Sequence, residues 1–175
     1  MRLVTFQGRS PKIDSLAYVA ESAVLIGDVK VGPYSSVWEN TVLRADWNSI
    51  TIGSHTSIQD NCTIHVTLMG QTVIGNYVTM GHNSMIHGAT IGSNTIIGIS
   101  SVVLDNAVIE DFSMVGAGAV VPPKTVVPSK HIALGIPAKI REFKGDPSIF
   151  QLMADGYVQL AQEYRKENTE HQEPE

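Results

Sequence analysis

An aliphatic side chain returns at every sixth residue between positions 91 and 127 of this chain. These positions are Ile91, Ile97, Val103, Ile109, Val115, Val121 and Val127. A small side chain stands four residues after each of the first six, at Thr95, Ser101, Ala107, Ser113, Ala119 and Thr125. Neither the roughly 3.6-residue period of an α-helix nor the alternation of a plain β-strand produces this spacing. A six-residue period is typical of a hexapeptide β-solenoid, in which each hexad supplies one short strand and one corner.

The hexads also predict how the coils stack. Three hexads complete one triangular coil, so residues about 18 apart lie about 4.8 Å from each other along the axis. Less regular hexads extend the pattern toward the N-terminus, at Val31, Val37, Leu43, Ile52, Ile58, Ile64, Ile74, Met80 and Ile86. Extra residues at 46–52 and 65–74 interrupt the phase, and we expect them to loop out. The sequence therefore predicts an all-β solenoid, a parallel β-helix of hexapeptide repeats.

The regular hexads end near Val127, and the rest of the chain has a different pattern. We predict that residues 1–145 form the solenoid and its lead-in, and that 146–167 form an α-helix packed on the solenoid. Asp146 followed by Pro147 is a typical helix start. Apolar residues then recur at helical spacing, at Ile149, Leu152, Met153, Tyr157, Leu160 and Tyr164. The polar tail 168–175 is expected to be disordered.

Composition excludes several classes of partner. The 175-residue chain has a formal net charge of −5, and its Lys and Arg residues form no cluster, so we expect no nucleic-acid partner. Residues 1–20 contain no long apolar run, so we expect no signal peptide and no membrane span. The single cysteine, Cys62, cannot form an internal disulfide and is interpreted as a small corner residue. These features favour a cytoplasmic location.

Two of the six histidines fall at equivalent positions of the repeat. His65 directly follows the hexad residue Ile64, and His87 directly follows Ile86. Successive coils would bring their ring nitrogens close to the separation of about 3.4 Å set by two ligands on tetrahedral zinc. His82 belongs to the preceding face, but a threefold assembly would bring it to the pair of a neighbouring chain. On spacing alone, a metal site and ordinary surface or core histidines are both open readings.

Three segments, LRADWNSI, SIQDNCTIH and GHNSMIHG, resemble the γ-class carbonic anhydrase family. The resemblance covers residues from about 10 to about 165, which is most of the chain. It implies a left-handed parallel β-helix and a homotrimer with a metal site between subunits. It also implies that His65 and His87 come from one chain and His82 from the next. Zinc is the implied metal, and Fe(II) or Co(II) suits the same three imidazoles.

The resemblance further implies reversible hydration of CO₂ to bicarbonate by attack of a metal-bound hydroxide. It assigns Gln59 to orient that hydroxide. Tyr157 is placed near the metal pocket, with a purely packing role as the alternative. Arg44, Asp46 and Asp60 are implied to form ion pairs across the subunit interface.

One departure from the family archetype concerns the loop after His65. Its sequence, VTLMGQTV, has no ionisable side chain, where the archetype carries acidic residues that move protons. The resemblance therefore implies an enzyme with weak turnover. It also leaves three rival functions open: a hexapeptide acyltransferase using acyl-CoA, a CoA-thioester hydrolase, and a non-catalytic trimeric scaffold that keeps its metal. The histidine spacing and short loops favour the carbonic anhydrase reading.

Overall fold

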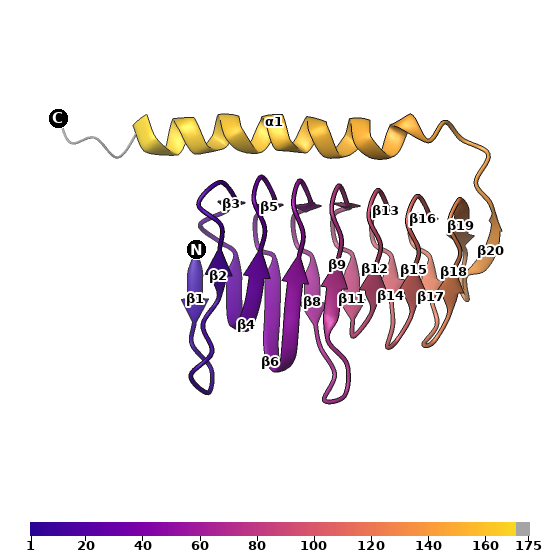
Figure 1. The fold of residues 1–175 in the computed structure, drawn as a ribbon, viewed down its shortest axis with the longest axis horizontal. Coiled ribbons are helices and arrows are strands. Elements are labelled where there is room, and N and C mark those ends of the chain that lie inside the picture. Colours follow the sequence, from indigo (N-terminus) through magenta and orange to yellow (C-terminus); the bar gives the residue numbers. More distant parts are fainter. Residues whose placement is uncertain (171–175) are drawn as a thin grey trace.

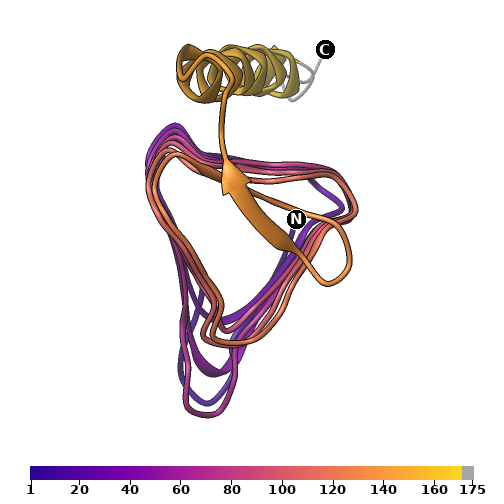
Figure 2. The same cartoon turned by 90° about the vertical axis from the view of Figure 1, so that its right-hand side faces the viewer.

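The computed structural model describes residues 1–170, which form a parallel β-solenoid with one long helix lying along its side (Figure 1). Viewed along the solenoid axis, the coils superpose as a triangle, and the helix lies outside one of its three faces (Figure 2). The first face consists of β3 (Tyr18–Val19), β5 (Ser36–Val37), β7 (Ser57–Ile58), β10 (Thr79–Met80), β13 (Ile96–Ile97), β16 (Met114–Val115) and β19 (His131–Leu134). The antiparallel strand β20 (Lys139–Glu142) pairs with β19 and ends this sheet.

The other two faces belong to one larger sheet. The second face contains β1 (Arg2–Val4), β8 (Thr63–His65), β11 (Met85–His87), β14 (Val102–Val103) and β17 (Val120–Val121). The third contains β2 (Lys12–Ile13), β9 (Thr72–Ile74), β12 (Thr90–Ile91), β15 (Val108–Ile109) and β18 (Val126–Val127). Two longer strands, β4 (Val24–Val31) and β6 (Val42–Ile52), pair with strands of both faces.

The predicted hexad register is confirmed. In the parallel pairs β12–β15 and β15–β18, Ile91 lies opposite Ile109 and Ile109 lies opposite Val127. All seven aliphatic hexad residues of the regular run are buried in one continuous core. The residue just before a small corner residue adopts a left-handed backbone conformation, as at Asn94 (φ 53°) and Asn106 (φ 57°). Asparagine tolerates this conformation better than most residues, so it suits these corners.

The first phase interruption forms a bulge within a strand. β6 runs from Val42 to Ile52, and its residues between Ala45 and Ile50 have no register partner in β4, β8 or β9, so they protrude from the coil. Both halves of β6 pair with β4, and the register shifts between Gly27 and Val29. A Cβ atom at Gly27 would lie 2.2 Å from the carbonyl oxygen of Ala45, so only glycine allows this close approach. The second interruption does form a loop, which the Thr67 N–H closes by donating to the Gly70 carbonyl at 2.9 Å.

The C-terminal helix α1 spans Ser148–Glu170. Asp146, the residue predicted to cap this helix, accepts a hydrogen bond from the Ser148 N–H at 2.9 Å, and the helix itself begins at Ser148. It ends three residues later than predicted, so 168–170 belong to the helix and not to the expected disordered tail. Residues 171–175 of that tail lie outside the described part of the chain.

Helix α1 packs on the first face through aromatic rings. The Trp38 ring centroid lies 5.2 Å from that of Tyr164 and 6.0 Å from that of Tyr157. The Trp38 indole N–H donates to Ser36 Oγ at 2.9 Å and to Ser57 Oγ at 3.0 Å, which fixes the ring on the sheet. No helix within residues 1–170 is both long and apolar enough to cross a membrane. The cytoplasmic location stays a prediction from sequence.

Candidate metal centre

The β8–β11 pairing brings two imidazoles together. His65 and His87 are register partners at the ends of these strands, so their side chains leave the same face one coil apart. Nδ1 of His65 lies 3.1 Å from Nε2 of His87. The prediction that these two histidines occupy equivalent positions on successive coils is therefore confirmed.

Each ring also contacts a carboxylate through its other nitrogen. Nε2 of His65 lies 2.9 Å from Oδ1 of Asp46, and Nδ1 of His87 is hydrogen-bonded to Oδ1 of Asp105. An ionised carboxylate only accepts hydrogen bonds, so the ring nitrogens beside Asp46 and Asp105 carry the hydrogen atoms. When both rings are neutral, the two nitrogens that face each other both carry lone pairs, and these lone pairs repel each other. A metal ion bound by both nitrogens would relieve this repulsion, and two neutral imidazoles backed by carboxylates are a typical donor set for a divalent metal.

Asp46 is held in its ionised form. Partial burial acts to raise the pKa of its carboxyl, but hydrogen bonds from His65 and Arg44 outweigh burial, and the pKa lies below its usual value. The Arg44 guanidinium donates to Oδ2, and the Trp47 backbone N–H donates to Oδ1 at 3.0 Å. Asp46 therefore stays an acceptor for His65 throughout the neutral range.

His82 lies apart from the pair, at the corner that follows β10. Its Nδ1 lies 2.8 Å from Oδ2 of Asp60, and 42% of its side chain is exposed. Each of the three predicted ligands thus has one ring nitrogen beside an aspartate. Within residues 1–170, no three His, Cys, Asp or Glu side chains of this single chain converge to hold a metal ion. One chain therefore brings two imidazoles together and leaves the third at a separate corner.

Gln59 and Tyr157 connect the helix to this separate corner. The Gln59 side chain is buried, and its Oε1 accepts a hydrogen bond from the His82 backbone N–H at 3.2 Å. The side chains of Gln59 and Tyr157 share a second hydrogen bond. Burial, and then the negative charge of Asp60, raise the pKa of the Tyr157 phenol above its ordinary value. Tyr157 is thus a neutral partner of Gln59 as well as a packing residue.

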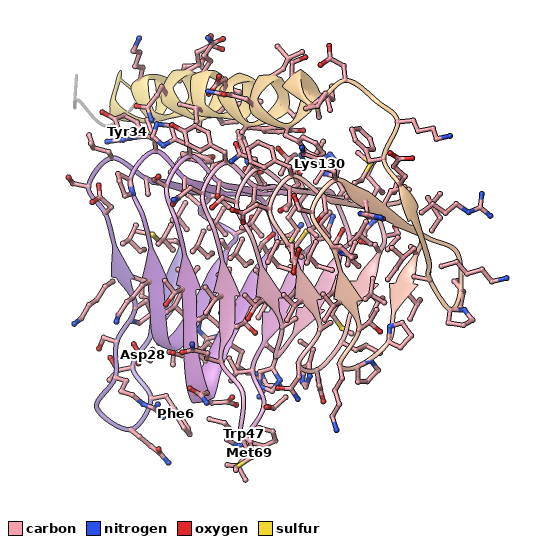
Figure 3. The ribbon with its side chains drawn as sticks, turned by 45° about the vertical axis from the view of Figure 1, so that its right-hand side comes forward. Phe6, Asp28, Tyr34, Trp47, Met69 and Lys130 are labelled. Carbon is pink, nitrogen blue, oxygen red and sulfur yellow. The ribbon has the colours of Figure 1, made fainter. Side chains whose placement is uncertain are left out.

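The structure adds residues that sequence reasoning missed. The β11–β14 register pairs Ile86 with Val103, an offset of 17 residues, so Asp105 lies at the corner one coil beyond His87. Asp105 stands one residue past the position equivalent to His87, so no repeat position predicted it. Trp47 lies beside the pair, with its ring centroid 5.6 Å from that of His65. The loop after His65 is apolar and exposed, with Leu68 70% and Met69 91% accessible, and it lies near Trp47 at the same corner (Figure 3).

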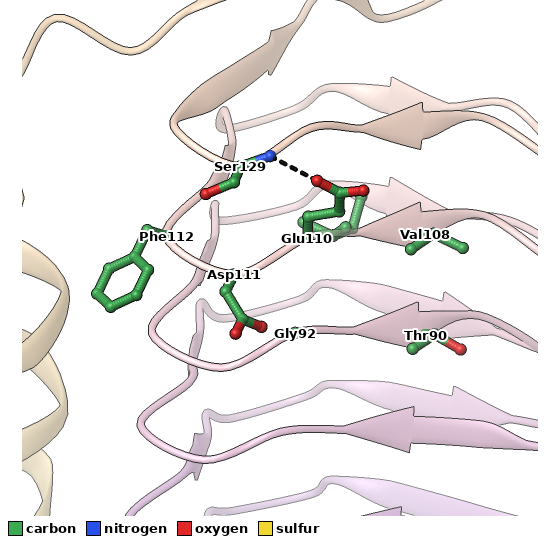
Figure 4. Close-up of a pocket in the computed structure, with 8 residues that line it drawn as sticks. Thr90, Gly92, Val108, Glu110, Asp111, Phe112 and Ser129 are labelled. Carbon is green, nitrogen blue, oxygen red and sulfur yellow. Dashed lines mark hydrogen bonds between the residues drawn. The ribbon is translucent and has the colours of Figure 1, made fainter.

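A cavity of about 580 Å³ lies elsewhere, between the third face and the corner at Phe112 (Figure 4). The Glu110 carboxylate at its edge accepts a hydrogen bond from the Ser129 N–H at 2.9 Å. None of the three histidines or their aspartate partners lines this cavity. The candidate metal centre is therefore separate from this cavity.

Comparisons with known proteins agree with this geometry. The family profile "Bacterial transferase hexapeptide (six repeats)" matches residues 88–123. A protein named carbonic anhydrase from Geobacillus kaustophilus is 36% identical over 91% of this chain and 89% of its own length. Gamma carbonic anhydrase 2 of Arabidopsis thaliana, a mitochondrial protein, is 40% identical over 92% of this chain. The chain belongs to the γ-carbonic anhydrase family. It spans 61% of the length of that plant relative.

Solved structures support the family fold over nearly the whole chain. A hexapeptide transferase family protein from Anaplasma phagocytophilum is 39% identical and superposes with a TM-score of 0.90, covering 93% of this chain and 98% of that one. A putative acetyltransferase from Bacillus cereus is 34% identical with a TM-score of 0.92, covering 94% and 97%. The γ-carbonic anhydrase fold is thus shared with proteins that carry transferase names, so the function must be argued from the site.

Proposed function

We propose that this member of the γ-carbonic anhydrase family is a metal-dependent lyase that hydrates CO₂ reversibly to bicarbonate, with zinc as its metal. The observation that carries the proposal is the His65–His87 pair. Its two facing nitrogens lie 3.1 Å apart, and the opposite nitrogen of each ring is fixed by an aspartate. Fe(II) and Co(II) are alternative metals because imidazole binds all three.

The third ligand is proposed to be His82 of a neighbouring chain in a homotrimer. Nδ1 of His82 faces Asp60, which leaves Nε2 on the exposed edge of the ring for a metal. A cyclic assembly places the same two surfaces of every chain in contact, so one such interface creates three equivalent sites. Arg44 is half-exposed beside this region, and its ion pairs with a neighbour's aspartates stay a prediction.

The chain's own residues have separable tasks in this reaction. A bound metal supplies Lewis acidity, which makes water a nucleophile near neutral pH. Asp46 and Asp105 fix which nitrogen of each histidine carries its hydrogen atom. Gln59 accepts from the His82 N–H through Oε1 and contacts the Tyr157 phenol, so one amide N–H remains to donate toward an oxygen of the substrate or the attacking water. The exposed side chains of Trp47, Leu68 and Met69 make the surface beside the pair apolar, which suits an apolar gas such as CO₂.

Stopped-flow measurement of CO₂ hydration tests the proposal. Metal-loaded wild-type protein should accelerate the reaction, and His82→Ala should abolish the acceleration because one ligand is removed. Absence of activity in protein loaded with zinc, and separately with Fe(II), would contradict it. Acyl-CoA thioesters offered to the same preparations test the transferase and hydrolase alternatives. A metal-bound trimer without turnover on either substrate class would support the scaffold alternative.

Replacing Tyr157 with phenylalanine should lower the CO₂ hydration rate by roughly two- to tenfold, because Gln59 loses one hydrogen-bond partner. The pH profile should keep its shape from about pH 6 to about pH 9, since the raised pKa keeps the phenol protonated throughout that range. Rates of both proteins across this range provide the measurement. An alkaline limb that disappears in the variant would show that Tyr157 titrates during turnover and would refute this role.

A further inference from the structure

The carboxylate of Asp105 is placed by the solenoid itself. Strand β14 pairs in parallel register with β11, so the corner after β14 lies one coil beyond His87. The backbone around Asp105 is held from both neighbouring coils: the Asn106 N–H donates to the Gly88 carbonyl at 2.7 Å, and the Lys124 N–H donates to the Asp105 carbonyl at 2.9 Å. The Asp105 carboxylate therefore meets the His87 ring from a rigid corner and not from a loop.

Asp46 and Asp105 differ in what else they bind. The Asp46 carboxylate accepts from Arg44 and from the Trp47 backbone N–H as well as from His65. Among the residues that the structure describes, the Asp105 carboxylate has a single hydrogen-bond partner, Nδ1 of His87. Removing the Asp105 carboxylate thus changes one imidazole, whereas removing that of Asp46 disturbs three donors. Asp105 offers the cleaner test of what an aspartate does for this site.

We propose that Asp105 is a positioning residue for metal binding, which holds His87 in the tautomer with hydrogen on Nδ1 and directs the lone pair of Nε2 toward Nδ1 of His65. The inference rests on the proposed function, because it concerns the same metal centre. A neutral imidazole has two tautomers, and the wrong one points an N–H group at the metal. A carboxylate excludes the wrong tautomer because it cannot donate a hydrogen bond. It also makes the ring a stronger donor to the metal.

The substitution Asp105→Asn isolates this effect. An asparagine amide can accept from Nδ1–H or donate to a bare Nδ1, so it stabilises both tautomers and no longer selects one. We expect the zinc dissociation constant of the assembled protein to rise roughly 10- to 100-fold. Competition with a chromophoric zinc chelator measures this constant without any assay of activity. The Co(II) absorption spectrum at saturating metal should keep its wild-type form, because the ligands themselves are unchanged, whereas His87→Ala should alter it.

Asp111→Asn provides a matched control. Asp111 lies on the same coil at the next corner, beside the cavity of Figure 4, and its Oδ1 accepts from the Ser93 N–H at 2.8 Å. The Asp111→Asn variant loses the same charge as Asp105→Asn, and its zinc dissociation constant should stay within about twofold of that of the wild type. Equal affinities for Asp105→Asn and wild type, or equal losses in the two variants, would overturn the role of Asp105 and leave the proposed function standing. A wild-type protein that binds no zinc would instead overturn the proposed function.

Discussion

Equal amounts of His82→Ala and His65→Ala chains, unfolded and refolded together with zinc, should regain about a quarter of wild-type CO₂ hydration, although each variant alone is inactive. The reason is that His65 and His87 form a pair within one chain, whereas His82 lies at a separate corner. In a mixed trimer, a site is intact wherever a His82→Ala chain supplies the pair and a His65→Ala neighbour supplies His82. Random assembly creates this arrangement at about one site in four.

A second mixture controls for nonspecific recovery. His65→Ala and His87→Ala chains each lack one member of the same pair, so no arrangement of them completes a site. This mixture should stay inactive at every ratio. Recovery in both mixtures, or in neither, would contradict a site shared between chains. Zinc content measured on the same samples should follow the activities.

Replacing Ile97 with alanine should lower the free energy of unfolding by about 2–5 kcal/mol. Ile97 is fully buried and lies between Met80 and Val115 of the neighbouring coils, so its removal leaves a cavity that a stacked sheet closes only in part. Denaturant unfolding of the metal-free protein, with all variants at one protein concentration, measures the difference.

Ile99→Ala is the control for this prediction. This variant makes the same isoleucine-to-alanine change two residues later in the chain, where the side chain is 51% exposed. Its effect should stay within about 0.5 kcal/mol. Equal destabilisation by the two substitutions would mean that the inward hexad residues do not form the buried core. That result would contradict the assignment of the repeat.

The hexad pattern predicts the coil register because both have the same physical origin. An inward aliphatic residue is required once per strand, and parallel pairing then fixes which residues lie opposite each other. This is why Ile64 and Ile86, and with them His65 and His87, could be aligned from the sequence alone. The role of these histidines as ligands, with His82 of a neighbour, stays a prediction that the geometry supports.

Other features of the structure could not be predicted from the six-residue period. The continuous strand β6 depends on the absence of a side chain at Gly27, a contact between chain segments that no repeat pattern encodes. Asp105 could not be predicted because an aspartate at a solenoid corner has the same sequence signal as an ordinary surface residue, whether or not it supports a metal ligand. The helix end at Glu170 was missed because polar residues give little signal when a helix extends beyond its packed face.

The pairing of His65 with His87 across coils makes the ligand spacing a property of the backbone. Adjacent parallel strands have nearly the same separation in every sheet, so the distance between the two rings depends little on how the core side chains are packed. Duplication or loss of whole coils beyond the Asp105 corner would lengthen or shorten the protein without moving either ring. One coil inserted between the two strands that carry these histidines would double the separation of the strands to about 9.6 Å, and the two rings would no longer meet. Whole coils can therefore be gained or lost near the ends of such a solenoid, whereas a coil inserted between His65 and His87 would abolish their pairing.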